Sequence, residues 1–429
     1  MAFPLDDAKW NREHYKIFSI ISLSFLLDGI FFSIVPLLMY LLVPIELATL
    51  VFTINLICFT IGSFVFGRFA DYYGRRLLFI VSLLIYLSSS ILLAVIHSNI
   101  IAVTVLTSAI NFGIGGEIGA AYSAIAEMIP ARHRGKVLLL STNFWNIGAL
   151  VISGIALFYS QISQDVTTQV TGVVLASSIL AVIVALARLH LPESPRWLIE
   201  KGRINDAMKI VQRIVGGSAN LNISNKQQGN PIGLIQAFRK YLFRLLVLLV
   251  AQSSQLLTYN MIAYYFPYVP DFVYPSDSIP LIIMIANLGA SIGAFILLPL
   301  IDKSRRVSIL IAFLGGTLTS LGILLAYGQP LQILLSIILV NMVFSEFAWG
   351  TLVPLESELF PTGVRASVVG FISAFSNILT AAVIYTEGLI PSITYLEIAI
   401  ATWALGFIVS LLWFIRGIES ARKSVDQLS

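Results

Sequence analysis

The chain has 429 residues, of which 58% are hydrophobic and 11% are charged, and its mean hydropathy is +0.90. A water-soluble domain carries roughly a quarter charged residues, so this composition excludes an ordinary soluble protein. The net charge of +4 and the isoelectric point near 9.0 are also found in nucleic-acid-binding proteins. The basic residues, however, are confined to short segments between apolar runs, so membrane topology explains them better and no nucleic acid partner is predicted.

The apolar runs are long enough to cross a bilayer as helices. About 20 predominantly apolar residues span the hydrocarbon core, and these runs are continuous, unlike the short alternating strands of a membrane barrel. Residues 1–16 are charged and show no signal-peptide pattern, so the first run is expected to stay in the mature protein. The twelve predicted spans begin near Ile17, Ile45, Leu77, Ile100, Val137, Val166, Tyr241, Ser278, Val307, Leu331, Ala366 and Pro391.

Lys and Arg residues alternate along the chain. They occupy the N-terminus, every second connection and the C-terminus, whereas the connections near Pro44, His97, Gln164, Asp277, Gln329 and Ser392 contain none. Cytoplasmic loops of membrane proteins carry an excess of Lys and Arg. The pattern therefore predicts a multi-pass plasma membrane protein with both termini in the cytoplasm, and it supports an even number of spans.

Two stretches of the chain repeat at one constant spacing. The sequence "IGSFVFGRFAD" (61–71) matches "IGAFILLPLID" (292–302), and "EMIPARHRG" (127–135) matches "ELFPTGVRA" (358–366). Parallel repeats of this kind place a binding site near the bilayer midplane, between the two halves. We therefore predict an N-terminal six-helix bundle (1–190), a cytoplasmic linker (191–240) and a C-terminal six-helix bundle (241–429). The segment "GGSANLNISNKQQGNP" (216–231) has the composition of a flexible linker.

Three motifs resemble those of a known family. "GRFADYYGRR" (67–76) resembles the cytoplasmic loop signature of the major facilitator superfamily, and "PESPRWLIEKGR" (192–203) and "AEMIPARHRG" (126–135) resemble segments of its sugar porters. The resemblance, to a sugar porter-like or metabolite-proton symporter-like branch, implies an all-α fold of twelve transmembrane helices in two pseudo-symmetric bundles. It also implies a carrier that exposes a central site alternately to each side.

The charged residues of the repeated motifs are expected to form a cytoplasmic gate. Arginines there can pair with carboxylates, and acids can cap helix N-termini. The alternative is a solvated loop that only sets topology. The predicted gate residues are Arg68, Asp71, Arg75, Arg76, Glu127, Arg134, Asp302, Arg305, Arg306, Glu358 and Arg365.

Asp28, Glu117 and Glu346 are the carboxylates expected well inside spans. Ionisable groups there are costly and are functional hypotheses by default. Burial disfavours the charged form, so Asp28 is predicted to bind and release a proton, and the resemblance implies an acid here in proton-coupled members. Glu117, in "NFGIGGEIGAAY", is predicted to be a second proton site or a substrate contact. The alternative for all three is a structural acid that is hydrogen-bonded to a neighbouring helix.

The seventh span carries the clearest substrate signal. In "AQSSQLLTYNMIAYYFPYVP" (251–270), the Gln, Asn and Tyr-Tyr positions resemble a sugar porter pattern. Amides donate and accept hydrogen bonds at once, which suits neutral hydroxyl-rich ligands; the alternative is hydrogen bonding between helices. The predicted substrate-binding residues are Gln252, Gln255, Asn260, Tyr264, Tyr265, Glu346, Trp349, Asn377 and Asn143. The sequence departs from the sugar porter pattern at Asn143 and Trp349.

The predicted function is a secondary active transporter for a small polar solute, with a sugar or polyol favoured and protons as the coupling ion. No Lys or Arg stands at the centre of a span, which argues against an anionic substrate. An organic acid or organic cation symporter is the alternative, and a carrier-fold sensor is a distant one. No catalytic or metal-binding spacing is present, so neither an enzyme nor a cofactor is expected. The expected partners are the solute, protons and lipid, and the expected state is a monomer.

Overall fold

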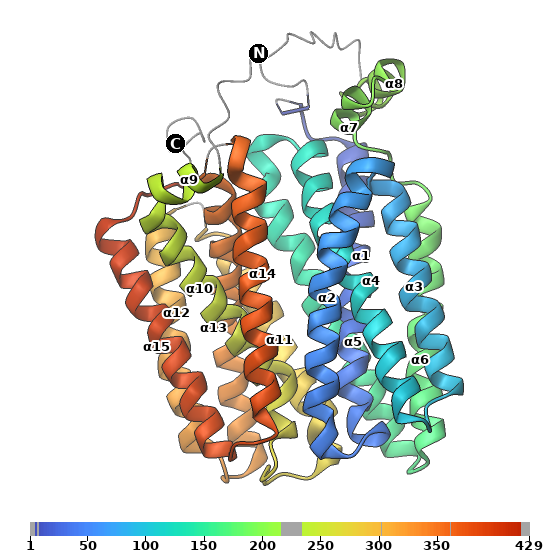
Figure 1. The fold of residues 1–429 in the computed structure, drawn as a ribbon, viewed down its shortest axis with the longest axis vertical. Coiled ribbons are helices and arrows are strands. Elements are labelled where there is room, and N and C mark those ends of the chain that lie inside the picture. Colours follow the sequence, from blue (N-terminus) through green and yellow to red (C-terminus); the bar gives the residue numbers. More distant parts are fainter. Residues whose placement is uncertain (1–4, 7, 216–233, 302, 361, 422–429) are drawn as a thin grey trace. The chain divides into compact units, whose positions relative to one another are not determined.

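A computed structural model describes residues 5–6, 8–215, 234–301, 303–360 and 362–421. Figure 1 shows a helical protein, and the described residues contain no strand. Among these residues, twelve helices are long and apolar enough to cross a membrane, which confirms the predicted all-α class and the predicted number of spans. The predicted starts lie within a few residues of the observed ones.

The spanning helices of the first half are α1 (Arg12–Leu42), α2 (Ile45–Tyr73), α3 (Arg75–Val95), α4 (Ile100–Met128), α5 (Arg134–Ile162) and α6 (Val166–Arg188). Those of the second half are α10 (Leu242–Asn260), which continues through η2 (Met261–Tyr265) and η3 (Phe266–Tyr268), and then α11 (Ile279–Leu297), α12 (Arg305–Ala326), α13 (Leu331–Glu358), α14 (Thr362–Glu387) and α15 (Ser392–Arg416). Short helices are η1 (Ala131–His133), α7 (Pro195–Glu200), α8 (Ile204–Val215), α9 (Leu234–Lys240) and η4 (Ser276–Ser278).

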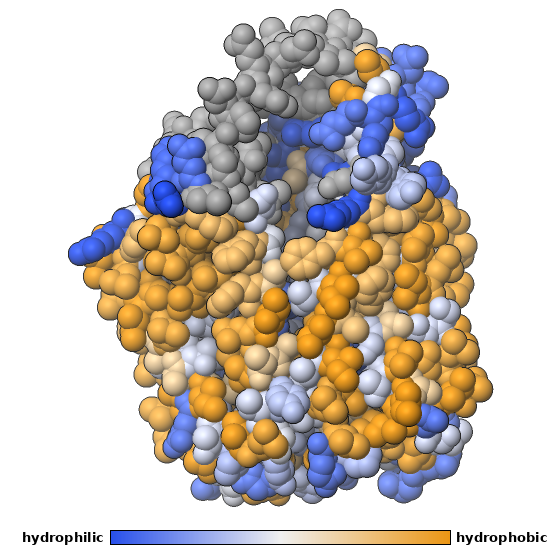
Figure 2. All heavy atoms as spheres, in the orientation of Figure 1, coloured by the Kyte–Doolittle hydropathy of each residue, from blue (hydrophilic) through white to orange (hydrophobic). Residues whose placement is uncertain are grey.

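Large apolar side chains stand on the outer faces of these helices. Leu84, Ile179, Leu318 and Leu325, for example, are 59%, 64%, 61% and 72% exposed. Figure 2 shows, on the face drawn, hydrophobic residues over the middle of the helices and hydrophilic residues at their ends. Hydrocarbon chains are as apolar as these side chains, so the arrangement suits a bilayer and not water.

The chain groups into two compact units. Unit 1 comprises Met1–Leu38 and Cys58–Lys226, and unit 2 comprises Met39–Ile57 and Gln227–Ser429. The last residues of α1 and the first part of α2 therefore belong to unit 2. The domain limits predicted from the repeats stay a prediction, and each unit is described by itself below.

In unit 1, α3 packs against α4 and α6, and α5 packs against α6. The contact between α1 and α5 depends on two glycines. A Cβ atom on Gly29 would lie 2.1 Å from the carbonyl oxygen of Trp145, and one on Gly148 would lie 2.1 Å from that of Leu26. The two backbones can touch only because neither residue has a side chain, as is common between membrane helices.

In unit 2, α13 packs against both α11 and α12, and α10 packs against α14 and α15. The α10 helix loses its regular geometry at η2, which is a π-helical segment. Such segments are rare and are frequent at functional sites. The change occurs next to Asn260, one of the residues that the sequence places in the substrate site.

The predicted linker, 191–240, is partly helical. Ser194 caps α7 by accepting a hydrogen bond from the Trp197 amide at 3.2 Å, and Trp197, Leu198 and Ala207 form a small apolar cluster between α7 and α8. The segment predicted to be flexible, 216–231, lies outside the described residues. The predicted linker thus contains the short helices α7, α8 and α9, and apolar side chains and a capping serine stabilise the first two.

Candidate functional site

Unit 1 contains a buried polar cluster formed by four helices. Arg188, the last residue of α6, is paired with Glu117 of α4, and the two side chains are 1% and 0% exposed. The guanidinium also donates to Ser24 Oγ at 3.1 Å and to the carbonyl oxygen of Phe79 at 2.8 Å. Ser82 Oγ lies 3.0 Å from Glu117 Oε2. The pair is thus held from several sides, as a buried ion pair requires.

Asp28 of α1 belongs to the same cluster. It is fully buried and interacts electrostatically with both Glu117 and Arg188. Neither of its carboxylate oxygens accepts a hydrogen bond from the described residues. The cluster therefore holds two acidic groups and one basic group, and the second acid lacks the donors that a buried carboxylate needs.

Arg188 is a buried cation that the sequence does not reveal. It is the last residue of α6, so the prediction that no Lys or Arg stands at the centre of a span is unaffected, but a basic residue at a helix end is expected to be solvated. Arg188 is instead enclosed by α1, α3 and α4. Its charge is already matched by Glu117, so its presence alone does not indicate an anionic ligand.

Unit 2 contains the residues predicted to bind substrate on α10. Gln255 Nε2 lies 3.3 Å from Ser345 Oγ of α13, and Asn260 Nδ2 donates to the carbonyl oxygen of Leu256 at 2.8 Å. The oxygens Gln252 Oε1, Gln255 Oε1 and Asn260 Oδ1 are buried and have no hydrogen-bond donor among the described residues. Three acceptors without donors on one helix are unusual, because buried polar groups are nearly always satisfied.

Tyrosines beside these amides form a second polar group. Tyr259 and Tyr264 hydroxyls lie 3.1 Å and 3.3 Å from Asn287 Oδ1 of α11. Asn287 was not predicted, because a lone Asn in an apolar span has no sequence signal of its own. Tyr265, also predicted for the substrate site, packs against Phe52 with ring centroids 4.5 Å apart.

The remaining predicted substrate residues have different surroundings. Glu346 of α13 is buried, and Trp349, one turn further along, is half-buried. Asn377 Nδ2 donates to the carbonyl oxygen of Ser373 in its own helix, at 2.9 Å. Asn143 belongs to unit 1, where its Oδ1 accepts a hydrogen bond from Asn146 at 3.3 Å.

In the first repeat, several predicted gate residues come together. Arg75 Nη2 lies 3.2 Å from Glu127 Oε1. Glu193, which follows α6, accepts hydrogen bonds from the backbone amides of Arg75 and Arg76, at 3.0 and 3.2 Å. A carboxylate at this helix N-terminus satisfies otherwise unpaired amides and interacts favourably with the helix dipole.

The three other predicted gate residues of this repeat do not join this arrangement in the described contacts. Arg134 pairs with Asp6, which also accepts from Arg196 at 3.0 Å, so Asp6 joins the start of α5 to α7. Arg68 is exposed. Asp71 lies in α2, but its side chain is outside the described set.

The second repeat uses the same capping arrangement. Glu419, after α15, accepts hydrogen bonds from the backbone amides of Arg305 and Arg306, at 3.0 and 3.4 Å, and from Ser304 Oγ at 2.5 Å. Although partial burial opposes it, these hydrogen bonds hold the pKa of Glu419 below its usual value. Asp302 and the side chains of Glu358 and Arg365 lie outside the described residues.

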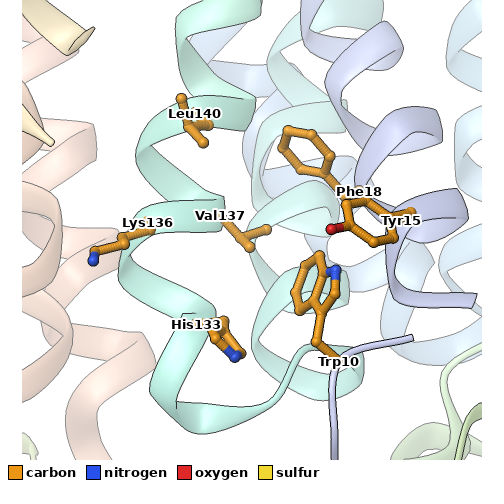
Figure 3. Close-up of a pocket in the computed structure, with 7 residues that line it drawn as sticks. All are labelled: Trp10, Tyr15, Phe18, His133, Lys136, Val137 and Leu140. Carbon is orange, nitrogen blue, oxygen red and sulfur yellow. The ribbon is translucent and has the colours of Figure 1, made fainter. Parts of the chain in front are cut away.

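Figure 3 shows a pocket of about 290 Å³ in unit 1, at the end that carries the basic residues. Its walls are largely aromatic and apolar. The lining residues are Trp10, Tyr15, Phe18, His133, Lys136, Val137 and Leu140. None of these residues was predicted to bind substrate. Burial, together with Arg132 and Lys136, lowers the pKa of His133, which favours the neutral imidazole in the pocket wall.

Sequence reasoning missed Glu193 and Glu419, although a signal was present. Both are followed by serine after the last helix of their half, in "PES" (192–194) and "IES" (418–420). A comparison of the segments that follow the sixth and twelfth spans finds this repeat. Arg188 offered only a weak signal, because a basic residue at a helix end is normally solvated.

The comparisons with known proteins agree with this architecture. The model of the sugar (and other) transporter family matches residues 43–422. The inner membrane metabolite transport protein YgcS of Escherichia coli (strain K12) is 27% identical over 432 residues, which cover 95% of this chain and 93% of YgcS. The niacin transporter NiaP of Acinetobacter baylyi is 24% identical over 444 residues, covering 97% of each chain.

A solved structure of the proton:xylose symporter XylE, a major facilitator superfamily protein, has the same fold. Its TM-score is 0.75 at 18% sequence identity, and the match covers 98% of this chain and 99% of XylE. The family match covers most of the chain, including eleven complete spans. The chain therefore belongs to the sugar (and other) transporter family and has the major facilitator superfamily fold, so it is a multi-pass membrane transporter and not an enzyme.

Proposed function

We propose that this transporter carries a small neutral, hydroxyl-rich solute, with a sugar or polyol as the favoured class. The observation that supports this most directly is the set of three buried acceptors on α10, Gln252 Oε1, Gln255 Oε1 and Asn260 Oδ1, that lack donors among the described residues. A sugar hydroxyl group donates one hydrogen bond and accepts others, so it complements amide side chains. A carboxylate donates none and leaves these acceptors unsatisfied.

Proton coupling is the second part of the proposal, with the buried cluster of unit 1 as the proton site. With Asp28 and Glu117 both ionised, the cluster carries one negative charge in excess of Arg188. One bound proton makes it neutral, which a low-dielectric interior favours. Asp28 is the favoured carrier of that proton, because Glu117 is already held by Arg188 and Ser82.

The protein is further proposed to lie in the plasma membrane with both termini in the cytoplasm and to work by alternating access. The orientation follows from the Lys and Arg residues, which occur only at one set of helix ends. The Arg75–Glu127 pair and the capping residues Glu193 and Glu419 lie at those ends. They are proposed to act in the cytoplasmic gate.

An organic acid is the second candidate for the solute. The similarity to NiaP, whose name assigns it niacin, favours this class. An anionic solute requires a positive counterpart in the protein. Arg188 is the buried cation of unit 1, and it is already paired with Glu117, which is why the neutral class is preferred.

Ligand-induced thermal stabilisation of the purified protein tests the solute class. Sugars and polyols, carboxylates and organic cations are screened at about pH 5 and about pH 7, because a ligand that binds only the folded state raises the melting temperature by mass action. Stabilisation by sugars or polyols supports the proposal. Stabilisation by carboxylates alone replaces it with the organic acid candidate.

A matched pair of variants links the result to α10. Gln255→Leu removes an unsatisfied acceptor and is expected to abolish the stabilisation by the ligand while the ligand-free melting temperature is kept. Gln164→Leu changes an exposed glutamine outside the spans and is expected to leave the stabilisation unchanged. Full ligand stabilisation in Gln255→Leu contradicts the assigned role of this residue.

A further inference from the structure

Glu387, the last residue of α14, is a buried acid that neither the gate nor the proton cluster of unit 1 uses. Its side chain is 0% exposed, and neither of its carboxylate oxygens accepts a hydrogen bond from the described residues. It lies at the end of unit 2 that is free of Lys and Arg. An ionised carboxylate in such surroundings needs donors or a cation.

Aromatic residues surround this acid. The Tyr265, Tyr268 and Tyr395 side chains are 3%, 1% and 0% exposed, and each interacts with Glu387. Phe52 packs against Tyr265 and Tyr268, with ring centroids 4.5 Å and 4.9 Å apart. The tyrosines come from η2, η3 and α15, so Glu387 lies where these elements meet the end of α14.

The hydrogen bonds of Tyr395 indicate the protonation state of the Glu387 carboxyl group. The Tyr395 hydroxyl group donates its single proton to the carbonyl oxygen of Met261, at 3.0 Å. A tyrosine hydroxyl has one proton to donate, so while Tyr395 donates to Met261 it can meet the Glu387 carboxyl only as an acceptor. As long as the bond to Met261 is kept, a hydrogen bond between Tyr395 and Glu387 therefore needs a proton on Glu387.

Within unit 2, the sequence places no basic side chain at the end of the helices where Glu387 lies. The sequence contains no Lys, Arg or His in residues 39–57, 245–302, 307–364 or 366–415, which include nearly all of the spanning parts of unit 2. Other titratable groups at this end include Tyr40, which interacts with Tyr268, and the acids Glu46, Asp271, Asp277 and Glu397. A negative charge on any of these acids disfavours a further one on Glu387.

We propose that Glu387 is a proton-binding site that is occupied at neutral pH. The bound proton forms the first link of a hydrogen-bonded chain from Glu387 to Tyr395 and on to the carbonyl of Met261. This chain ties α14 and α15 to the π-helical segment η2, which follows Asn260 directly. Loss of the proton leaves an unpaired charge among tyrosines and removes the link between Glu387 of α14 and Tyr395 of α15. If the carrier is coupled to protons, which rests on the proposed function, Glu387 supplies a second proton site in addition to Asp28.

Infrared spectroscopy of the purified protein at pH 7 tests this directly. A protonated carboxyl group has a C=O stretching band that is separate from the carboxylate bands. The wild type is expected to show a band of this kind that Glu387→Gln lacks. The glutamine keeps the size of the side chain, and its NH2 group can still donate to Tyr395, so the fold is expected to survive. An unchanged band in Glu387→Gln overturns the proposal.

Three further variants make the assignment specific. Tyr395→Phe removes the acceptor of the proton, so the band is expected to shift to higher frequency; no shift means that the proton is not donated to Tyr395. Glu397→Gln, at an exposed acid on α15, is expected to leave the band unchanged. If the Glu397→Gln variant lacks the band, the assignment to Glu387 is overturned. Asp28→Asn is expected to retain the Glu387 band even if it loses coupled transport. The band thus reports on Glu387, and transport by Asp28→Asn reports separately on the proposed function.

Discussion

Arg188 of α6 and Glu117 of α4 form an ion pair that is sealed from solvent inside unit 1. Ser24, Phe79 and Ser82 supply the remaining polar contacts of the pair. Removal of two charges from water costs several kcal/mol per ion, which only close pairing and additional hydrogen bonds offset. The Asp28 carboxyl group therefore faces a guanidinium and a carboxylate that are held in place by their own pairing.

The first prediction concerns the loss of one partner. Glu117→Gln removes the acid that pairs with Arg188 and leaves only Asp28 to balance its charge, and breaking a buried pair costs up to about 3–5 kcal/mol. We expect a clear fall in the melting temperature of the purified protein. The double variant Glu117→Gln with Arg188→Gln removes both charges and is expected to be more stable than Glu117→Gln alone. If the double variant is the less stable of the two, the ion pair is not the source of the effect.

The second prediction concerns Asp28 and is measured in proteoliposomes. Asparagine cannot take up a proton, so Asp28→Asn is expected to abolish solute accumulation driven by a pH gradient. Counterflow exchange needs no net proton movement and is expected to be retained. Glu46→Gln, at an exposed acid of α2, is the control and is expected to accumulate solute as the wild type does. Normal accumulation in Asp28→Asn would falsify the proton assignment.

The third prediction concerns the contact between α1 and α5. A Cβ atom on Gly29 would lie 2.1 Å from a backbone carbonyl oxygen, so Gly29→Ala must push the two helices apart. Core overpacking costs typically 1–3 kcal/mol, and the melting temperature is expected to fall. Gly119→Ala is the matched control, because that helical glycine has no atom within 4 Å of the new methyl group. Equal melting temperatures for the two variants would show that the close approach is unimportant.

The sequence predicted the spans and the family far better than the contacts of single side chains. Length and continuity of the apolar runs suffice for twelve helices, because the hydrocarbon thickness sets the length of a span. The buried position of Arg188 and the role of Glu193 depend on which helices meet, and neither residue type nor spacing determines that. Glu387 was missed for a related reason. It stands at the end of its span, where an acid is normally expected to be solvated, and its burial is evident only from the structure.

The last prediction concerns the carboxylate that caps α12. Glutamine in place of Glu419 can accept through only one oxygen, so Glu419→Gln loses part of the bonds to Ser304, Arg305 and Arg306 and the favourable interaction with the helix dipole. The melting temperature is expected to fall at neutral pH.

The stabilisation of the protein by the Glu419 carboxylate depends on pH in a defined direction. Because its hydrogen bonds hold the folded-state pKa of Glu419 below the usual value, the carboxylate contributes stability above the unfolded-state pKa of about 4.3. That contribution is lost as the pH falls through the folded-state value. The difference in melting temperature between the wild type and Glu419→Gln should thus be full near neutral pH and shrink below about pH 4. A difference that stays constant over this range would mean that the charge of Glu419 does not stabilise the start of α12.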